Sequence, residues 1–95
     1  MNALILDTSV LVSLLRGDEA VIEKIKLCEK RREVLRTTSI TGFELYYGAY
    51  RSSRAEENIE LVSKLLKSLE VLVFDAEASR IAGSLLALSL IHISE

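Results

Sequence analysis

Three short strand-like segments, spaced far apart along this chain of 95 residues, constrain its fold more than any other feature. They are residues 3–6, 34–38 and 71–74, and they are rich in the apolar and β-branched side chains that suit a buried strand. In the long stretches between them, apolar residues recur at helical spacing. Parallel strands need long crossovers of this kind, whereas antiparallel strands can be joined by a short turn. The pattern therefore predicts an α/β fold with a parallel sheet and right-handed crossovers.

Local start and stop signals place two helices between the first and second strands. Thr8 or Ser9 can cap a helix that runs through Arg16, and Gly17 stands where helices often end in a left-handed turn. Asp18 begins the next helix, since apolar residues recur at helical spacing after it.

The later helices have similar signals. Ser39 or Thr41 can begin the third helix, and Ser53 with Glu56 forms a capping box for the fourth. Asp75 is the expected cap of the last helix. The predicted order is β-α-α-β-α-α-β-α, within a single domain that covers residues 1–95.

The composition excludes several classes of protein. Apolar residues make up 49% of the chain, enough for a core, and charged residues make up 27%, which is typical of a globular chain. The net charge of −2 gives no general attraction to nucleic acid, so contact with RNA needs local Arg or Lys side chains. The longest apolar tract, residues 81–93, is interrupted by polar residues and is shorter than the ~20 residues that span a bilayer. We therefore expect no membrane span.

Cys28 is the only cysteine of the chain, so it can form no internal disulfide. It lies in a helical pattern beside Leu27, and we expect it to pack as a small apolar side chain. The start of the chain lacks a basic region followed by a long apolar stretch, as a signal peptide would have. These features predict a cytoplasmic protein in a reducing environment.

Two carboxylates suggest a metal site. Asp7 stands where the first apolar run stops, and Glu44 follows the second strand. The carboxyl ends of parallel strands meet at one edge of a sheet, where ligands of open α/β folds bind. Mg²⁺ and Mn²⁺ prefer hard oxygen ligands, and Thr8, Ser9 and Thr38 add hydroxyl groups at the same edge. The sequence thus suggests a small acidic pocket for a divalent cation.

Each acid also has a purely structural explanation. Asp7 can be the N-cap or a first-turn acid of the following helix. Glu44 can be the acidic member of a capping box that begins at Thr41. From the residues alone, both the metal site and these helix-start roles stay open.

Two further groups are candidates for contacts with other molecules. Arg51 and Arg54 follow the helix that carries Glu44, so they can reach phosphates of a nucleic acid, although surface arginines are usually only solvated. Aromatic residues gather on the same helix: Phe43, Tyr46, Tyr47 and Tyr50. We expect mainly core packing for these rings, with a partner interface as the alternative.

Three segments of the chain together resemble one protein family. They read LILDTSVLVSLLRG at residues 4–17, TTSITGFELYYGA at residues 37–49 and VLVFDAEASRIAG at residues 71–83. In this order they closely resemble a PIN domain, and most of all the VapC toxins of prokaryotic toxin–antitoxin pairs. The likeness runs from residue 1 to about residue 87.

The resemblance implies a three-layer α/β/α fold and a Mg²⁺- or Mn²⁺-dependent endoribonuclease. It also implies a homodimer and a small cognate antitoxin that covers the acidic pocket. Asp7 and Glu44 match the first and second metal-binding acids of the family, and Thr8 or Ser9 matches the hydroxyl position beside the first. Asp75 matches a common helix-start acid, not a metal ligand.

The end of the chain departs from the family. One or two further aspartates are expected after the last helix, and this sequence does not contain them. Residues 88–95 are atypical for the family and suggest a truncation, a shifted reading frame or an added tail, in which His92 has no function. We therefore expect weakened metal binding, three strands with later strands absent, and an exposed edge at the first strand that an oligomer or the apolar tail would cover.

Three functions follow as hypotheses. The first is RNA cleavage by metal-activated water, with Asp7 binding the ion and Glu44 binding it or orienting the water. The second is a non-catalytic binding module, derived from a PIN domain, that associates with an antitoxin or with itself. A flavodoxin-like or response-regulator-like domain is a third hypothesis. It would need a lysine late in the chain, and because the last lysine is Lys67 we rank it lowest.

Overall fold

The computed structural model of the chain describes residues 3–88 and has the predicted order of elements. The elements are β1 (Ala3–Ile5), α1 (Thr8–Leu15), α2 (Glu19–Lys30), β2 (Val34–Thr38), α3 (Ser39–Arg51), α4 (Ala55–Lys67), β3 (Glu70–Leu72) and α5 (Ala76–Leu88). The atypical tail and His92 lie outside the described residues, apart from Leu88, where α5 ends.

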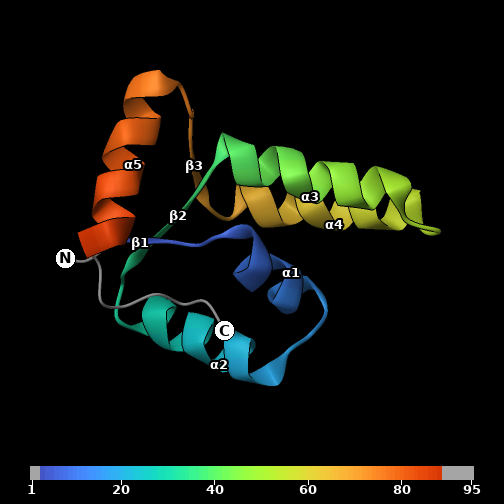
Figure 1. Cartoon of the computed structure of the whole chain (residues 1–95). Coiled ribbons are helices and arrows are strands. Elements are labelled where there is room, and N and C mark those ends of the chain that lie inside the picture. Colours follow the sequence, from blue (N-terminus) through green and yellow to red (C-terminus); the bar gives the residue numbers. More distant parts are fainter. Residues whose placement is uncertain (1–2, 89–95) are drawn as a thin grey trace.

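The three strands form one parallel sheet in the order β1-β2-β3, so β2 lies in the middle. In Figure 1, α5 lies on one side of this sheet, and α1, α3 and α4 lie on the other. α3 and α4 form a hairpin that extends away from the sheet (Figure 1). The α/β fold with three layers is confirmed. Among the described residues β1 has one neighbouring strand only, as expected for a sheet edge.

The core lies between the sheet and the helices of the α1–α4 side. Leu6, Val10 and Leu11 are almost completely buried. Leu6 directly follows β1, and Val10 and Leu11 lie on the inner face of α1. Leu45 and Val62 add the inner faces of α3 and α4. This packing fixes α1 and α3 against each other at the carboxyl end of the sheet. No helix within residues 3–88 is long and apolar enough to cross a membrane.

Several local predictions are confirmed. Gly17 ends α1 with a φ of 81°, a conformation that favours glycine. Asp18 caps α2 through hydrogen bonds from the backbone N–H groups of Ala20 and Val21. Asp75 accepts from Ala78 N at 2.8 Å, at the start of α5. Cys28 is buried, and this burial raises the pKa of its thiol, so it packs as an apolar side chain.

Three element boundaries differ from the prediction. α1 is capped by Asp7 rather than by Thr8 or Ser9, since Asp7 Oδ1 accepts from Val10 N. α3 begins at Ser39, one of its two predicted starts, and Thr38 caps it. The capping box of Ser53 and Glu56 is wrong, because α4 begins at Ala55 after Arg54, which makes no side-chain cap. β3 covers Glu70–Leu72 instead of residues 71–74. It ends early because Leu72 pairs with Thr38, the last residue of β2 before the chain turns into α3.

Candidate active site

Asp7 follows β1 and caps α1. Its Oδ1 accepts hydrogen bonds from Val10 N at 3.0 Å and from Ser9 Oγ at 3.1 Å. The N-cap role of Asp7 is therefore present in the structure. The side chain is exposed, and no residue within 3–88 donates a hydrogen bond to its other oxygen, Oδ2. Capping thus uses one carboxylate oxygen of Asp7, and the second oxygen takes no part in it.

Glu44 lies in the second turn of α3, too far along the helix to cap it. The capping-box explanation for Glu44 is therefore wrong, because Thr41 is itself inside the helix. Glu44 Oε1 instead accepts a hydrogen bond from the hydroxyl of Thr8, at the start of α1. Capping of α3 therefore does not explain why residue 44 is an acid.

One residue connects the two acids. Thr8 follows Asp7 directly in the chain and donates to Glu44, so the carboxyl end of β1 and the second turn of α3 meet at this threonine. Behind it lie two buried hydroxyl groups, those of Thr38 and Thr41. The structure thus gathers Asp7, Thr8 and Glu44 at one edge of the sheet, with Ser9 bonded to Asp7.

The chemistry of these groups fits a largely hydrated divalent cation. Mg²⁺ usually keeps several of its waters in proteins and binds through one or two carboxylates. Asp7 and Glu44 supply two exposed carboxylates, each with one oxygen not used in the hydrogen bonds above. Within residues 3–88, no three His, Cys, Asp or Glu side chains are close enough to hold a metal ion together.

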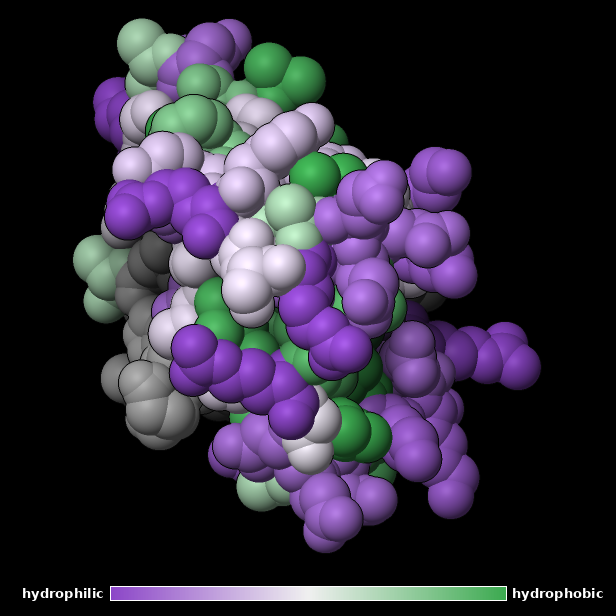
Figure 2. Space-filling view, turned by 90° about the vertical axis from the view of Figure 1, so that its right-hand side faces the viewer, coloured by the Kyte–Doolittle hydropathy of each residue, from purple (hydrophilic) through white to green (hydrophobic). Residues whose placement is uncertain are grey.

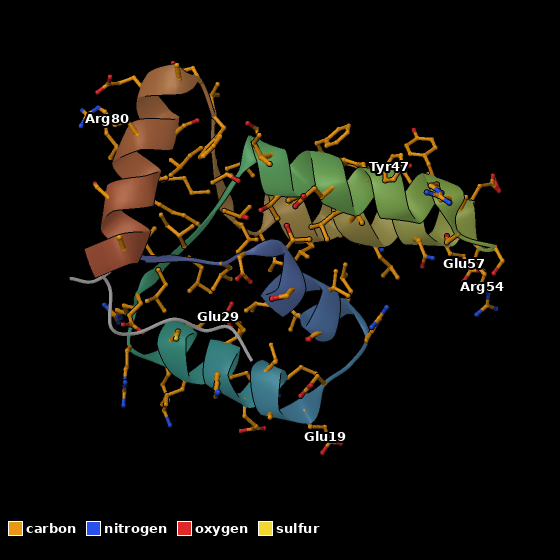
Figure 3. All side chains as sticks on the ribbon, viewed as in Figure 1. Glu19, Glu29, Tyr47, Arg54, Glu57 and Arg80 are labelled. Carbon is orange, nitrogen blue, oxygen red and sulfur yellow. The ribbon has the colours of Figure 1, made fainter. Side chains whose placement is uncertain are left out.

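The predicted RNA-contact residues lie at the end of α3 and the start of α4, and each has a partner other than the two acids. Arg51 is in the last turn of α3, where its guanidinium covers the ring of Tyr47 at 5.4 Å and donates to the Tyr47 hydroxyl. Arg54 pairs with Glu57 at 3.5 Å, at the free end of the α3–α4 hairpin (Figure 3). The structure does not bring these two arginines to the acidic residues.

An apolar groove lies beside Glu44, between α1 and the α3–α4 hairpin. Its volume is about 290 Å³. Its walls are mainly apolar side chains, and its polar members include Glu44, Arg16 and Asn58. Sequence reasoning missed Arg16, which lines the same groove as Glu44 because α1 packs against α3. No motif in the sequence signals that the two residues share a groove.

The aromatic residues of α3 do not mainly pack in the core, contrary to expectation. Phe43, Tyr47 and Tyr50 are 67%, 53% and 68% exposed, and Ile40 beside them is 49% exposed. The rings of Phe43 and Tyr47 stack with centroids 6.1 Å apart. Tyr46 alone points inward, with its hydroxyl 2.8 Å from Ser63 of α4. We call the four exposed residues the α3 stripe.

The surface near the free end of the hairpin has a different character. Figure 2 shows this side of the molecule, where hydrophilic side chains surround smaller hydrophobic areas. Arg54, Glu57 and Glu60 are among the exposed charged residues of this end, and Arg54 and Glu57 pair with each other. A mixture of both charges gives little attraction for a polyanion, because neighbouring charges of opposite sign cancel.

Known proteins provide an independent comparison. The model of the PIN domain family matches residues 4–90. A chain of the DNA-bound VapBC complex from Salmonella typhimurium is 32% identical, with a TM-score of 0.70 over 92% of this chain. A chain of VapBC2 from Rickettsia felis, bound to a promoter DNA fragment, is 24% identical, with a TM-score of 0.72 over 90% of this chain.

The present chain spans 64% of the length of each of those two chains. Among curated proteins, no sequence matches it significantly. The family match covers nearly the whole chain, and it agrees with the three motifs and with the parallel α/β fold. The chain therefore belongs to the PIN domain family, and its resemblance to the VapC type is confirmed.

Proposed function

We propose that this chain is the PIN domain of a VapC-like toxin, an endoribonuclease that depends on Mg²⁺ or Mn²⁺. The observation that supports this most is the meeting of Asp7, Thr8 and Glu44 at the carboxyl end of the sheet. Asp7 caps α1, but asparagine caps a helix about as well, so capping does not explain the negative charge of Asp7. Glu44 caps no helix. A cytoplasmic location belongs to the same proposal.

Asp7 and Glu44 would hold the metal ion, which supplies an activated water and neutralises charge on the phosphate when it is bound. Ser9 donates to Asp7 and Thr8 donates to Glu44, so each carboxylate is held in one orientation before any ligand arrives. Such preorganised groups cost no rearrangement at the moment of reaction. Arg16, which lines the same groove as Glu44, would add a positive charge suited to a phosphate of the RNA backbone.

Glu44→Gln is the substitution that tests this function. It keeps the size of the side chain and an oxygen that can accept from Thr8, but it removes the negative charge. We expect loss of Mn²⁺-dependent cleavage of a single-stranded RNA and at least about tenfold weaker Mn²⁺ binding by calorimetry. Glu60→Gln, on the exposed face of α4, is the matched control and should change neither.

The outcomes separate the enzyme from its rival. Cleavage that persists in Glu44→Gln would refute the assignment of Glu44. A folded chain that neither binds Mn²⁺ nor cleaves RNA, yet binds an antitoxin, would favour the non-catalytic binding module. Binding of an antitoxin is compatible with both the enzyme and the binding module, so RNA cleavage and Mn²⁺ binding are the measurements that distinguish them.

A partner protein is the second part of the proposal. The solved relatives are VapBC complexes, and an antitoxin that covers the acidic residues is expected for a VapC-like toxin. The groove that Glu44 lines supports such a partner, since its walls are mainly apolar and its lining residues Arg16 and Glu44 can make polar contacts. A segment bound there would block access to the candidate site.

The α3 stripe supports a homodimer as the further partner. Its exposed rings would be buried between two copies, and apolar burial contributes roughly 25 cal/mol per Å². We expect the wild-type chain to sediment as a dimer and Tyr47→Glu to shift it to the monomer, because a charge would be buried in the contact. Leu27→Glu, at an exposed apolar position of α2, is the control. A monomeric wild type, or a dimer that tolerates Tyr47→Glu, would contradict this proposal.

A further inference from the structure

A chain of four side chains leads from the buried start of α3 to the candidate site. Thr38 Oγ1 lies 3.4 Å from Thr41 Oγ1, which lies 3.2 Å from Thr8 Oγ1, and Thr8 bonds to Glu44. Thr38 and Thr41 are buried, with 9% and 7% of their surface exposed. The chain thus begins in the protein interior and ends at an exposed carboxylate.

Chemistry fixes the direction of every hydrogen bond in this chain. An ionised carboxylate only accepts, so the single hydroxyl proton of Thr8 must point to Glu44. The contact between Thr8 and Thr41 must then be donated by Thr41, and the contact between Thr41 and Thr38 by Thr38. Thr38 accepts in turn from the backbone N–H of Thr41 at 3.2 Å. Each of the three hydroxyl groups therefore donates to one defined acceptor, and the successive hydrogen bonds polarise one another toward Glu44.

We propose that Thr41 is a positioning residue of the candidate site: its buried hydroxyl holds the hydroxyl of Thr8 in the orientation that fixes the Glu44 carboxylate. Within residues 3–88, the hydroxyl of Thr41 is hydrogen-bonded to Thr8 and Thr38 and to neither acid, so it acts through Thr8. Thr8 is held in the first turn of α1 and Thr38 at the N-cap of α3, so the backbone on both sides of Thr41 is fixed. This inference rests on the proposed function of Glu44.

Thr41→Val is the direct test. It keeps the branched shape and burial of the side chain but removes the hydroxyl, so Thr8 loses its donor. In the metal-free chain, three-bond couplings of the Thr8 and Glu44 Hα and Hβ protons should change from one rotamer to an average over several. Mn²⁺ binding, measured by calorimetry, should weaken about tenfold, as for other residues that orient a metal ligand.

Two variants control this test. Thr41→Ser restores a hydroxyl at the same place and should restore both the couplings and the Mn²⁺ affinity. Ser63→Ala removes the partly buried hydrogen bond to Tyr46, between α3 and α4, and should change neither reading. If Thr41→Val does not fold, the comparison of Thr41→Ala with Thr41→Ser isolates the hydroxyl in the same way.

The two readings distinguish failure of this inference from failure of the proposed function. Rotamers of Thr8 and Glu44 that stay fixed in Thr41→Val would overturn the positioning role, whatever the metal does. A wild-type chain that binds no Mn²⁺, with rotamers that respond to Thr41→Val, would overturn the metal site and leave the hydroxyl chain standing. Equal losses in Thr41→Val and Thr41→Ser would also overturn the role of the hydroxyl.

Discussion

Asp7→Asn is expected to abolish Mn²⁺-dependent RNA cleavage while leaving the fold intact. Asparagine caps helices about as well as aspartate, and its amide oxygen can accept from Val10 N as Asp7 Oδ1 does. The free energy of unfolding should therefore stay within about 0.5 kcal/mol of the wild type. The negative charge is lost, so Mn²⁺ affinity should fall at least about tenfold, the smaller of the losses seen when residues around a metal are changed.

Two comparison variants make the result specific to the site. Asp7→Ala removes both cap and charge, so it should also lose about 1 kcal/mol of stability in urea unfolding. Asp18→Asn makes the same substitution at the N-cap of α2, where the side chain accepts from Ala20 N and Val21 N, and it should leave cleavage unchanged. Activity retained in Asp7→Asn, or stability lost as in Asp7→Ala, would refute the separation of the two roles.

Leu11→Ala should have the largest effect on stability. Leu11 has no exposed surface and sits in the centre of the core, where α1 packs against the sheet. Replacing a buried leucine by alanine costs about 2–5 kcal/mol, through lost burial and the cavity that remains. Small domains are stable by only about 5–15 kcal/mol, so much of the folded population is at risk. Urea unfolding followed by circular dichroism measures the loss.

Leu27→Ala is the matched control for this prediction. Leu27 lies on α2 with 46% of its surface exposed, so the same substitution there removes little buried area. Its free energy of unfolding should change by less than about 1 kcal/mol. A loss below about 1 kcal/mol for Leu11→Ala would mean that α1 does not anchor the core. The N-terminal turn of α1 carries Thr8 and adjoins Asp7, so the candidate site depends on that anchor.

Much of the fold was predictable because its signals are local. The order of the elements follows from short strand-like runs alternating with helical spacing, and β2 has the predicted bounds, residues 34–38. Gly17 and Asp18 mark the end of α1 and the start of α2 by their own conformation and hydrogen bonding. Such residues act within one turn of the chain, so the sequence around them contains what decides their structure.

The errors arose where several nearby residues could do the same task. Asp7, Thr8 and Ser9 all suit the cap of α1, and the structure uses Asp7. Ser39 and Thr41 both suit the start of α3, and the helix begins at Ser39 because the pairing of β2 with β3 ends at Thr38. The sequence also could not tell which face of α3 meets the core. Leu45 and Ala49 face it, so Phe43 and Tyr47 are left outside. That choice depends on α4, which packs against the face of α3 that carries Leu45 and leaves the face of Phe43 and Tyr47 exposed.

The amino-acid sequence by itself determined the family, the order of strands and helices, and the two acids at the sheet edge, because these depend on residue types and spacing. Only the tertiary structure decided what surrounds the acids. It brings Thr8 to Glu44 across 36 positions of the chain, and it buries Thr38 and Thr41 behind them. Contacts between residues so far apart depend on how α1 and α3 pack on the sheet, and no local pattern encodes that geometry.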